Sequence, residues 1–309
     1  MSADHLFMRR CLQLASCGRY GAPPNPMVGA VIVCEGRIIG EGYHVRCGEG
    51  HAEVNAFASV RPCDEPLLRR STLYVSLEPC SHQGKTPPCA DLIVRKGVPR
   101  VVVGCVDPFA QVQGRGIRRL REAGVEVTVG VLEAECRRLN RRFITFHAHG
   151  RPFITLKWAQ TADRFIALSD GTPITISNPA TRLLCHKRRA EHQAILVGTR
   201  TMQTDHPALT VRHWPGPDPR RIVLSRSNGP LPDQVRRWWG EGVQTLLVEG
   251  GRATLQAFID ADLWDEAFVE TGAAPLGKPG LPAPTLRHAL PAAVHLWGGH
   301  TIQAFQHSN

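Results

Sequence analysis

Two short segments of the sequence carry residue types that bind zinc, and they constrain the fold more than any other feature. His51 stands in the first segment, and Cys80 and Cys89 stand in the second. One histidine and two thiolates give Zn²⁺ three ligands and leave its fourth tetrahedral position open for water. The sequence therefore predicts a metal centre at these three residues, in a fold that brings both segments together.

Glu53 follows His51 by two residues, a position suited to moving protons rather than to binding the metal. Bound zinc lowers the pKa of its water towards ~7. Glu53 would take the water proton and pass it to a ring nitrogen and to departing ammonia. A structural zinc site is the alternative, but such sites normally have four protein ligands, and Cys63 and Cys105 both lie outside the motif. The pattern is typical of a hydrolytic zinc deaminase.

The chain has 309 residues, enough for about two domains of ~100–200 residues each. Two α/β patterns follow one another, and Gly-Pro punctuation near residues 149–152 separates them. The predicted domains are therefore 1–148, the deaminase domain, and 149–309. Alternation of helical and apolar strand-like segments predicts mostly parallel or mixed sheets covered by helices.

The expected elements are read from hydrophobic spacing. In the first domain, helices are predicted at 6–15, 52–60, 90–96, 117–123 and 132–146, and strands at 28–34, 72–77, 101–105 and 125–129. In the second, strands are predicted at 153–158, 194–198, 222–224, 245–248 and 267–270, helices at 180–190 and 253–261, and an irregular segment at 275–284.

Composition limits the setting in which the chain works. No segment approaches the ~20 apolar residues that span a bilayer, and the N-terminus lacks the basic and apolar regions of a secretory signal. Ten cysteines in such a chain are expected to be free or metal-bound. We expect a cytoplasmic protein with no membrane association. The net charge of +10 allows nucleic-acid binding, but the basic residues are scattered in short groups.

The zinc motif and its flanks resemble the riboflavin-biosynthesis deaminases. The match covers residues 24–33 and 42–44, the His51 segment, and the eight residues 81–88 between the two cysteines. In tRNA and cytidine deaminases that gap is typically two residues. The resemblance implies a diaminopyrimidinone carrying a ribosylamino 5′-phosphate as substrate. The positions that contact it in the family are Asn25, His44, His82 and Lys85.

The resemblance continues through nearly all of the second half, which looks like the reductase of the same bifunctional family. It implies a cytidine-deaminase-like three-layer domain followed by a dihydrofolate-reductase-like α/β domain that uses NADPH to convert the ribosyl group to a ribityl chain. The residues implied in NADPH binding are Thr201, Asp205, Gly250, Gly251, Arg252, Ala253 and Thr254. Those implied in binding the ribosyl phosphate are Arg189, Leu209, Arg212 and Glu249.

The physical case for the reductase is a Gly-Gly pair at the start of the helix predicted at 253–261. Glycines let a phosphate approach the free N–H groups of a helix start, although a simple turn looks the same. No G-x-G-x-x-G fingerprint is present, which disfavours a Rossmann dinucleotide site. Lys157 is a further candidate for contact with ribose or cofactor.

Three residues depart from the family pattern. Arg164 stands where glycine is usual, Thr175 where tryptophan is common, and His206 where Asp or Asn is usual. One alternative is therefore a deaminase with an impaired or structural C-terminal domain. A second is an RNA-editing deaminase, but the long cysteine spacing and only 6% aromatic residues argue against it. We expect a small-molecule enzyme that forms a homo-oligomer and does not bind nucleic acid.

Overall fold

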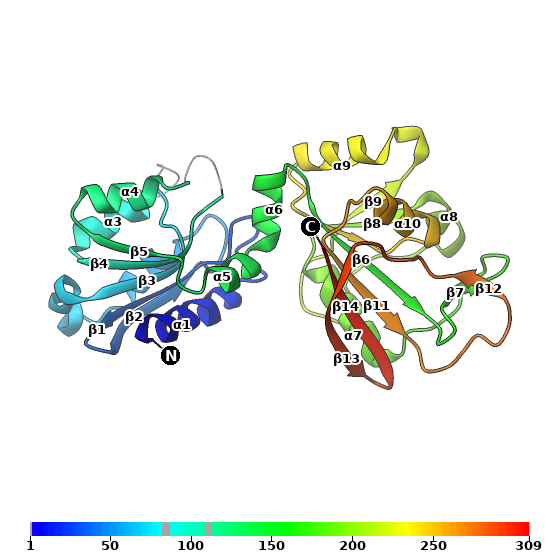
Figure 1. The fold of residues 1–309 in the computed structure, drawn as a ribbon, viewed down its shortest axis with the longest axis horizontal. Helices are drawn as coiled ribbons and strands as arrows, with labels where there is room; N and C mark the ends of the chain where they lie inside the picture. The colour runs from blue at the N-terminus through cyan, green and yellow to red at the C-terminus, as the bar shows by residue number, and fades with distance from the viewer. Residues whose placement is uncertain (1, 82–86, 109–112, 309) are drawn as a thin grey trace. The chain divides into compact units, whose positions relative to one another are not determined.

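A computed structural model describes residues 2–81, 87–108 and 113–308 (Figure 1). The chain forms two compact units, Met1–His149 and Gly150–Asn309. Each has its own sheet and its own buried core.

The N-terminal unit is built on a five-stranded sheet in the order β2-β1-β3-β4-β5. Its strands are β1 (Gly29–Cys34), β2 (Arg37–Tyr43), β3 (Thr72–Leu77), β4 (Arg100–Cys105) and β5 (Glu126–Val129). β3, β4 and β5 are parallel, whereas β1 is antiparallel to both of its neighbours. All six residues of β1 are buried, because helices cover both faces of the sheet.

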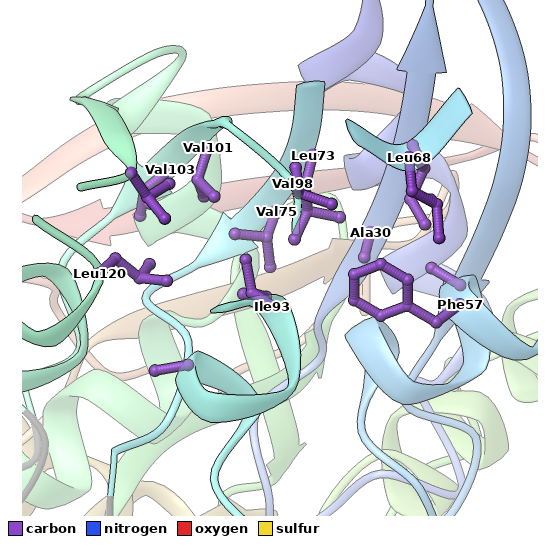
Figure 2. Close-up of a cluster of buried hydrophobic side chains, with 14 of the residues drawn as sticks. Ala30, Phe57, Leu68, Leu73, Val75, Ile93, Val98, Val101, Val103 and Leu120 are labelled. Atoms are coloured by element: carbon purple, nitrogen blue, oxygen red, sulfur yellow. The ribbon is translucent and has the colours of Figure 1, made fainter. Parts of the chain in front are cut away.

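Helices on the two faces make this unit a three-layer structure. One face carries α1 (Ala3–Cys17) and α5 (Glu133–Leu139), and the other carries α2 (Ala52–Ala58), the 3₁₀ helix Pro62–Arg70, α3 (Cys89–Lys96) and α4 (Arg115–Glu122). Figure 2 shows side chains of this second face packed on the sheet: Phe57 lies beside Ala30, Ile93 beside Val75, and Leu120 on the side of Val103. The N-terminal ends of α2 and α3 and the carboxyl end of β3 therefore all belong to the N-terminal unit.

The sequence did not predict β2, because its polar residues and glycines have little strand propensity. The structure explains the glycines. A Cβ on Gly40 would lie 2.6 Å from the carbonyl oxygen of Ala56, and one on Gly42 would lie 2.5 Å from the Ala56 nitrogen. Only glycine therefore lets α2 lie this close to β2.

The single helix predicted at 132–146 is wrong, because two helices occupy that range. α5 ends at Leu139 and α6 spans Arg141–His149. Asn140, between them, is buried, and its side chain pairs with the backbone of Met27: Oδ1 accepts from the Met27 N–H at 2.8 Å and Nδ2 donates to the Met27 carbonyl at 2.9 Å. Asn140 therefore marks the junction between the two helices and ties it to Met27.

The C-terminal unit contains a seven-stranded sheet in the order β13-β14-β11-β6-β10-β8-β9. Its strands are β6 (Phe153–Gln160), β8 (Ala194–Gly198), β9 (Arg220–Leu224), β10 (Thr245–Val248), β11 (Glu266–Thr271), β13 (Ala289–Trp297) and β14 (His300–His307). The five strands from β11 to β9 are parallel, and β13 and β14 form an antiparallel hairpin on one edge.

The remaining elements cover this sheet or extend from it. The helices are α7 (Pro179–Ala190), α8 (Thr199–Asp205), the 3₁₀ helix Arg226–Asn228, α9 (Leu231–Gly240) and α10 (Arg252–Asp260). β7 (Phe165–Leu168) pairs with β12 (Gly280–Pro282), so the segment predicted as irregular at 275–284 contains one short strand. Because β8 and β10 are parallel, α8 and α10 both begin at the carboxyl end of the sheet, where α/β folds place their ligands.

Candidate functional site

The three predicted zinc ligands meet in the N-terminal unit. His51 is the N-cap residue of α2, Cys89 is the first residue of α3, and Cys80 follows β3. His51 Nδ1 lies 3.5 Å from Cys80 Sγ and 3.4 Å from Cys89 Sγ. Bonds of ~2.0–2.3 Å at tetrahedral angles place neighbouring ligand atoms roughly 3.5 Å apart. The donor set and its spacing therefore fit zinc.

Electrostatics in the cluster favour a cation between the two sulfurs. Hydrogen bonds from the Cys89 thiol and from His51 lower the pKa of Cys80 to about 4. The pKa of Cys89 is raised, because the Cys80 thiolate lies beside it and burial adds to the cost of a second negative charge. A bound metal ion removes this conflict, since both cysteines then ligate as thiolates. The Cys89 N–H also donates to Cys80 Sγ at 3.3 Å, which helps to orient that sulfur.

Glu53 lies in the first turn of α2 and is 3% exposed. Burial, together with the negative charge of Cys80, raises the pKa of Glu53 to about 7. A carboxyl group with such a pKa exchanges protons readily near neutral pH.

Two of the predicted substrate contacts, Asn25 and His44, lie against each other. His44 Nδ1 is 3.1 Å from the Gly50 carbonyl oxygen, so this nitrogen carries the proton and Nε2 accepts from Asn25 Nδ2 at 3.1 Å. The His44 ring packs edge-on against His51, with 5.4 Å between centroids. Burial lowers the pKa of His44, which favours the neutral ring. The other two predicted contacts, His82 and Lys85, lie outside the described residues.

Glu78, two residues before Cys80, has a role that the sequence analysis did not assign. Its buried carboxylate accepts four backbone N–H groups, those of Asp107, Gly114, Gly116 and Ile117, at 2.9–3.3 Å. Gly116 also approaches the Pro79 carbonyl so closely that a Cβ would collide with it. Glu78 thus fastens the start of α4 to the residues just before Cys80. Its one sequence signal was an acidic residue at the end of a buried strand.

We expect Glu78→Gln to lower the free energy of unfolding of the zinc-loaded protein by about 1–3 kcal/mol. An amide offers one acceptor oxygen, so some of the four buried N–H groups lose their partner. Urea unfolding monitored by circular dichroism measures this change. Glu122→Gln, at an exposed position of α4, is the control and should leave the midpoint unchanged. Equal midpoints for both variants would contradict the anchoring role.

Most of the predicted cofactor residues lie close to the starts of α8 and α10, and Asp205 lies at the end of α8. Gly251 is the N-cap residue of α10, and a Cβ on it would lie 3.3 Å from Thr201 Oγ1 of α8. A Cβ on Gly250 would lie 2.6 Å from Thr254 Cβ, and one on Gly198 would collide with the Thr254 hydroxyl. Glycine at these positions lets the start of α10 pack closely against β8 and α8. The free N–H groups of the α10 start fit a cofactor phosphate.

The remaining predicted cofactor residues lie on the same two helices, α8 and α10. Arg252 and Ala253 are exposed in the first turn of α10. Asp205 is the last residue of α8, and its carboxylate accepts from Thr204 Oγ1 at 2.7 Å.

A buried ion pair joins two of the predicted reductase substrate contacts. Arg189 of α7 donates to both carboxylate oxygens of Glu249, at 3.1 and 2.6 Å, and also to the Thr210 carbonyl at 3.1 Å. Burial opposes ionisation of Glu249, yet Arg189 outweighs it, and the pKa of Glu249 lies below its ordinary value. Lys157 is half-buried, and although burial acts to lower its pKa, the neighbouring Cys185, Glu249 and Glu270 hold that pKa above the ordinary value.

Leu209 and Arg212 lie on the segment that Arg189 contacts. The Leu209 side chain is buried with Ile195 and Leu247 and cannot contact a ligand. A ligand here would have to bind the backbone of Leu209 or the neighbouring residues. Arg212 is exposed, and its backbone N–H donates to His186 Nδ1 at 3.1 Å.

Two of the three departures from the family pattern occupy left-handed backbone. Arg164 has φ +66° and His206 has φ +41°, whereas Thr175 is simply exposed. The expectation that position 164 needs a permissive backbone agrees with this φ, since glycine adopts it without strain. Non-glycine residues there cost of order 1–3 kcal/mol.

Comparison with known proteins agrees with both halves. Residues 1–105 match the cytidine and deoxycytidylate deaminase zinc-binding region, and residues 152–238 match the RibD C-terminal domain. The chain is 42% identical over 248 residues to the riboflavin biosynthesis protein RibD of Synechocystis, covering 80% of this chain and 66% of that protein. It is 46% identical to RibD of Aquifex aeolicus over 72% of this chain and 61% of that one. For RibD of Escherichia coli the identity is 40%, covering 79% and 74%.

The first two of these alignments thus span less than two thirds of the relatives' length. Solved structures match over more of both chains. A Thermotoga maritima diaminohydroxyphosphoribosylaminopyrimidine deaminase/5-amino-6-(5-phosphoribosylamino)uracil reductase superposes with a TM-score of 0.89 at 32% identity, covering 98% of each chain. Acinetobacter baumannii RibD superposes with a TM-score of 0.90 at 28% identity, also covering 98% of each.

Within the described residues, no helix combines the length and the apolar character needed to cross a membrane. The predicted fold class, a cytidine-deaminase-like unit followed by a reductase-type unit, is confirmed. The chain belongs to the RibD family of riboflavin biosynthesis.

Proposed function

We propose that the N-terminal unit is a zinc-dependent hydrolytic deaminase acting on 2,5-diamino-6-ribosylamino-4(3H)-pyrimidinone 5′-phosphate. The observation that supports this most is the convergence of His51, Cys80 and Cys89, with buried Glu53 in the same helix turn as His51. Zinc, when bound, acidifies its water and so supplies a nucleophile near neutral pH. Glu53 accepts the proton and returns it to the leaving amino group.

The substrate is held by groups that already have a fixed orientation. The neutral His44 ring orients the Asn25 amide by accepting from its Nδ2, which leaves the Asn25 amide oxygen and its second N–H to bind a pyrimidine edge. His82 and Lys85 supply donors for the 5′-phosphate. This division of roles favours a small phosphorylated nucleotide over a base within a nucleic acid.

The C-terminal unit is proposed to reduce the ribosyl side chain to ribityl. NADPH, when bound, supplies the hydride for this step. The starts of α8 and α10 hold the cofactor through Thr201, the glycines and the free N–H groups of α10. Arg212, whose side chain is exposed, is proposed to bind the phosphate of the ribosyl phosphate, since guanidinium groups bind phosphate in a forked geometry. Arg189 holds Glu249 and the backbone near Leu209 in place for the rest of this substrate.

The second candidate is a deaminase whose C-terminal unit is catalytically impaired. Arg164 and His206 favour it, because both occupy strained left-handed backbone where a permissive residue is usual.

One assay separates the two candidates. Zinc-loaded protein receives the diaminopyrimidinone ribosyl phosphate and NADPH, and ammonia release and NADPH oxidation are followed separately. The bifunctional proposal expects both signals, with oxidation following deamination. Ammonia release without NADPH oxidation supports the impaired C-terminal domain. The absence of both signals would contradict the deaminase proposal as well.

We further propose a cytoplasmic location and a homo-oligomer. None of the ten cysteines forms a disulfide, as a reducing compartment favours. β13 forms one edge of its sheet and exposes Leu290, Val294 and Leu296, the last by 80%. An apolar edge strand of this kind pairs readily with a second copy of itself.

Charge on this edge is expected to weaken self-association. Val294→Lys should shift the mass measured by light scattering towards the monomer, because an edge lysine opposes strand pairing. Val223→Lys on β9, the opposite edge strand, is the matched control. A monomeric wild-type protein, or the same mass for all three proteins, would contradict this interface.

A further inference from the structure

A second cluster of metal-ligand residues lies in the C-terminal unit, formed by three separate segments. Asp262 follows α10, His288 immediately precedes β13, and His307 is the last residue of β14. One carboxylate oxygen of Asp262 lies 3.0 Å from His288 Nδ1 and 2.8 Å from His307 Nε2. These three ligand atoms all lie within 4.8 Å of one another.

The geometry suits a first-row transition metal. With bonds of ~2.0–2.1 Å, adjacent ligand atoms are separated by about 2.9 Å in an octahedral sphere and about 3.4 Å in a tetrahedral one. The two nitrogen–oxygen distances fall at the lower of these values. A metal would replace the two ring protons that now bridge to the carboxylate, each imidazole keeping its proton on the other nitrogen.

The surroundings hold the ligands in place and leave the site open. The His307 side chain is 7% exposed, and its ring packs edge-on against the buried Trp264. The His288 side chain and the Asp262 carboxylate are mostly exposed, so an ion and its waters have access. The nearby cation Arg287 pairs with Asp260 at 3.8 Å, which partly neutralises its charge.

We propose that Asp262, His288 and His307 form a second binding site for a divalent transition-metal ion of the zinc type. Two imidazoles and one carboxylate are ligands that such ions prefer. Bound there, the ion joins the turn after α10 to both chain ends of the β13–β14 hairpin, beside the hydrogen bond from the Ser308 N–H to the His288 carbonyl. The site is independent of the deaminase centre, which lies in the other unit.

Metal stoichiometry tests the proposal on the full-length protein. Chelator-treated protein is dialysed against micromolar free zinc, and bound zinc is measured by mass spectrometry. We expect about two zinc ions per chain in the wild type and about one in His288→Ala or Asp262→Asn. His295→Ala, an exposed histidine within β13, is the matched control and should keep both. Circular dichroism melting without added metal checks that every variant is folded.

Cobalt substitution identifies which site each ion fills. The cysteine centre gives a sulfur-to-cobalt charge-transfer band in the near ultraviolet, whereas a site of nitrogen and oxygen ligands gives only weak visible bands. His288→Ala should remove the second signal and keep the first. One zinc per chain in the wild type, or unchanged stoichiometry in both folded variants, would overturn the proposal. A wild-type protein that lacks only the cysteine signal would instead count against the deaminase centre.

Discussion

Replacement of Glu53 by glutamine is expected to slow ammonia release by about 10²–10⁴-fold, the usual contribution of a positioned general acid–base group. Glutamine has nearly the same shape but cannot accept a proton from water. Zinc content should stay close to that of the wild type, because the proposed ligands are His51, Cys80 and Cys89. The measurements are ammonia release under saturating substrate and zinc per chain by mass spectrometry.

The control for this variant is Glu49→Gln, which makes the same chemical change at an exposed position close to His51. It should retain wild-type ammonia release and zinc. If Glu53→Gln lost the metal together with activity, Glu53 would be needed to build the centre rather than to move protons. Wild-type turnover in Glu53→Gln would show that another group carries the proton.

Replacement of Arg189 by alanine is expected to lower the free energy of unfolding of the C-terminal unit by about 3–5 kcal/mol, because it leaves the Glu249 carboxylate buried without its partner. The two side chains are only 13% and 10% exposed, so water offers little compensation. NADPH oxidation should be lost, whereas ammonia release should persist below the unfolding transition of the variant. Calorimetry and the two separate activity assays measure these effects.

Arg182→Ala provides the comparison, since Arg182 is an exposed arginine of the same helix. Its removal should change neither stability nor NADPH oxidation by a measurable amount. The double variant Arg189→Met/Glu249→Gln removes both charges and should recover part of the stability without recovering reduction. A single Arg189→Ala variant as stable as the wild type would show that the ion pair contributes no net stability.

Continuous apolar strands were the elements that sequence predicted best. The ranges 72–77, 194–198 and 245–248 coincide with β3, β8 and β10, because strands buried on both faces need unbroken apolar runs. The strands β2, β7, β12, β13 and β14 were missed, as were the helices α8 and α9. β2 carries glycines to admit α2, and β13 is an exposed edge strand whose composition no core constrains.

For the proposed zinc site, the sequence showed the ligand types. Local sequence signals also indicated that helices start near His51 and Cys89. For the reductase, local signals were weak, and the residue roles followed from family resemblance. The role of Glu78 could not be predicted, because its four partners are backbone groups 29 to 39 residues further along the chain.

The sequence by itself determined the chemistry available to this protein: one histidine, two thiolates and a nearby carboxylate in the first half, and a glycine-rich helix start in the second. Side-chain chemistry and short-range spacing are local properties, so they can be read without a fold. The tertiary structure alone decided which distant groups meet. It gave Asn140 its pairing with Met27, Arg189 its pairing with Glu249, and Asp262 its two histidines. Such contacts depend on how strands order within a sheet, and residue spacing along the chain does not encode that order locally.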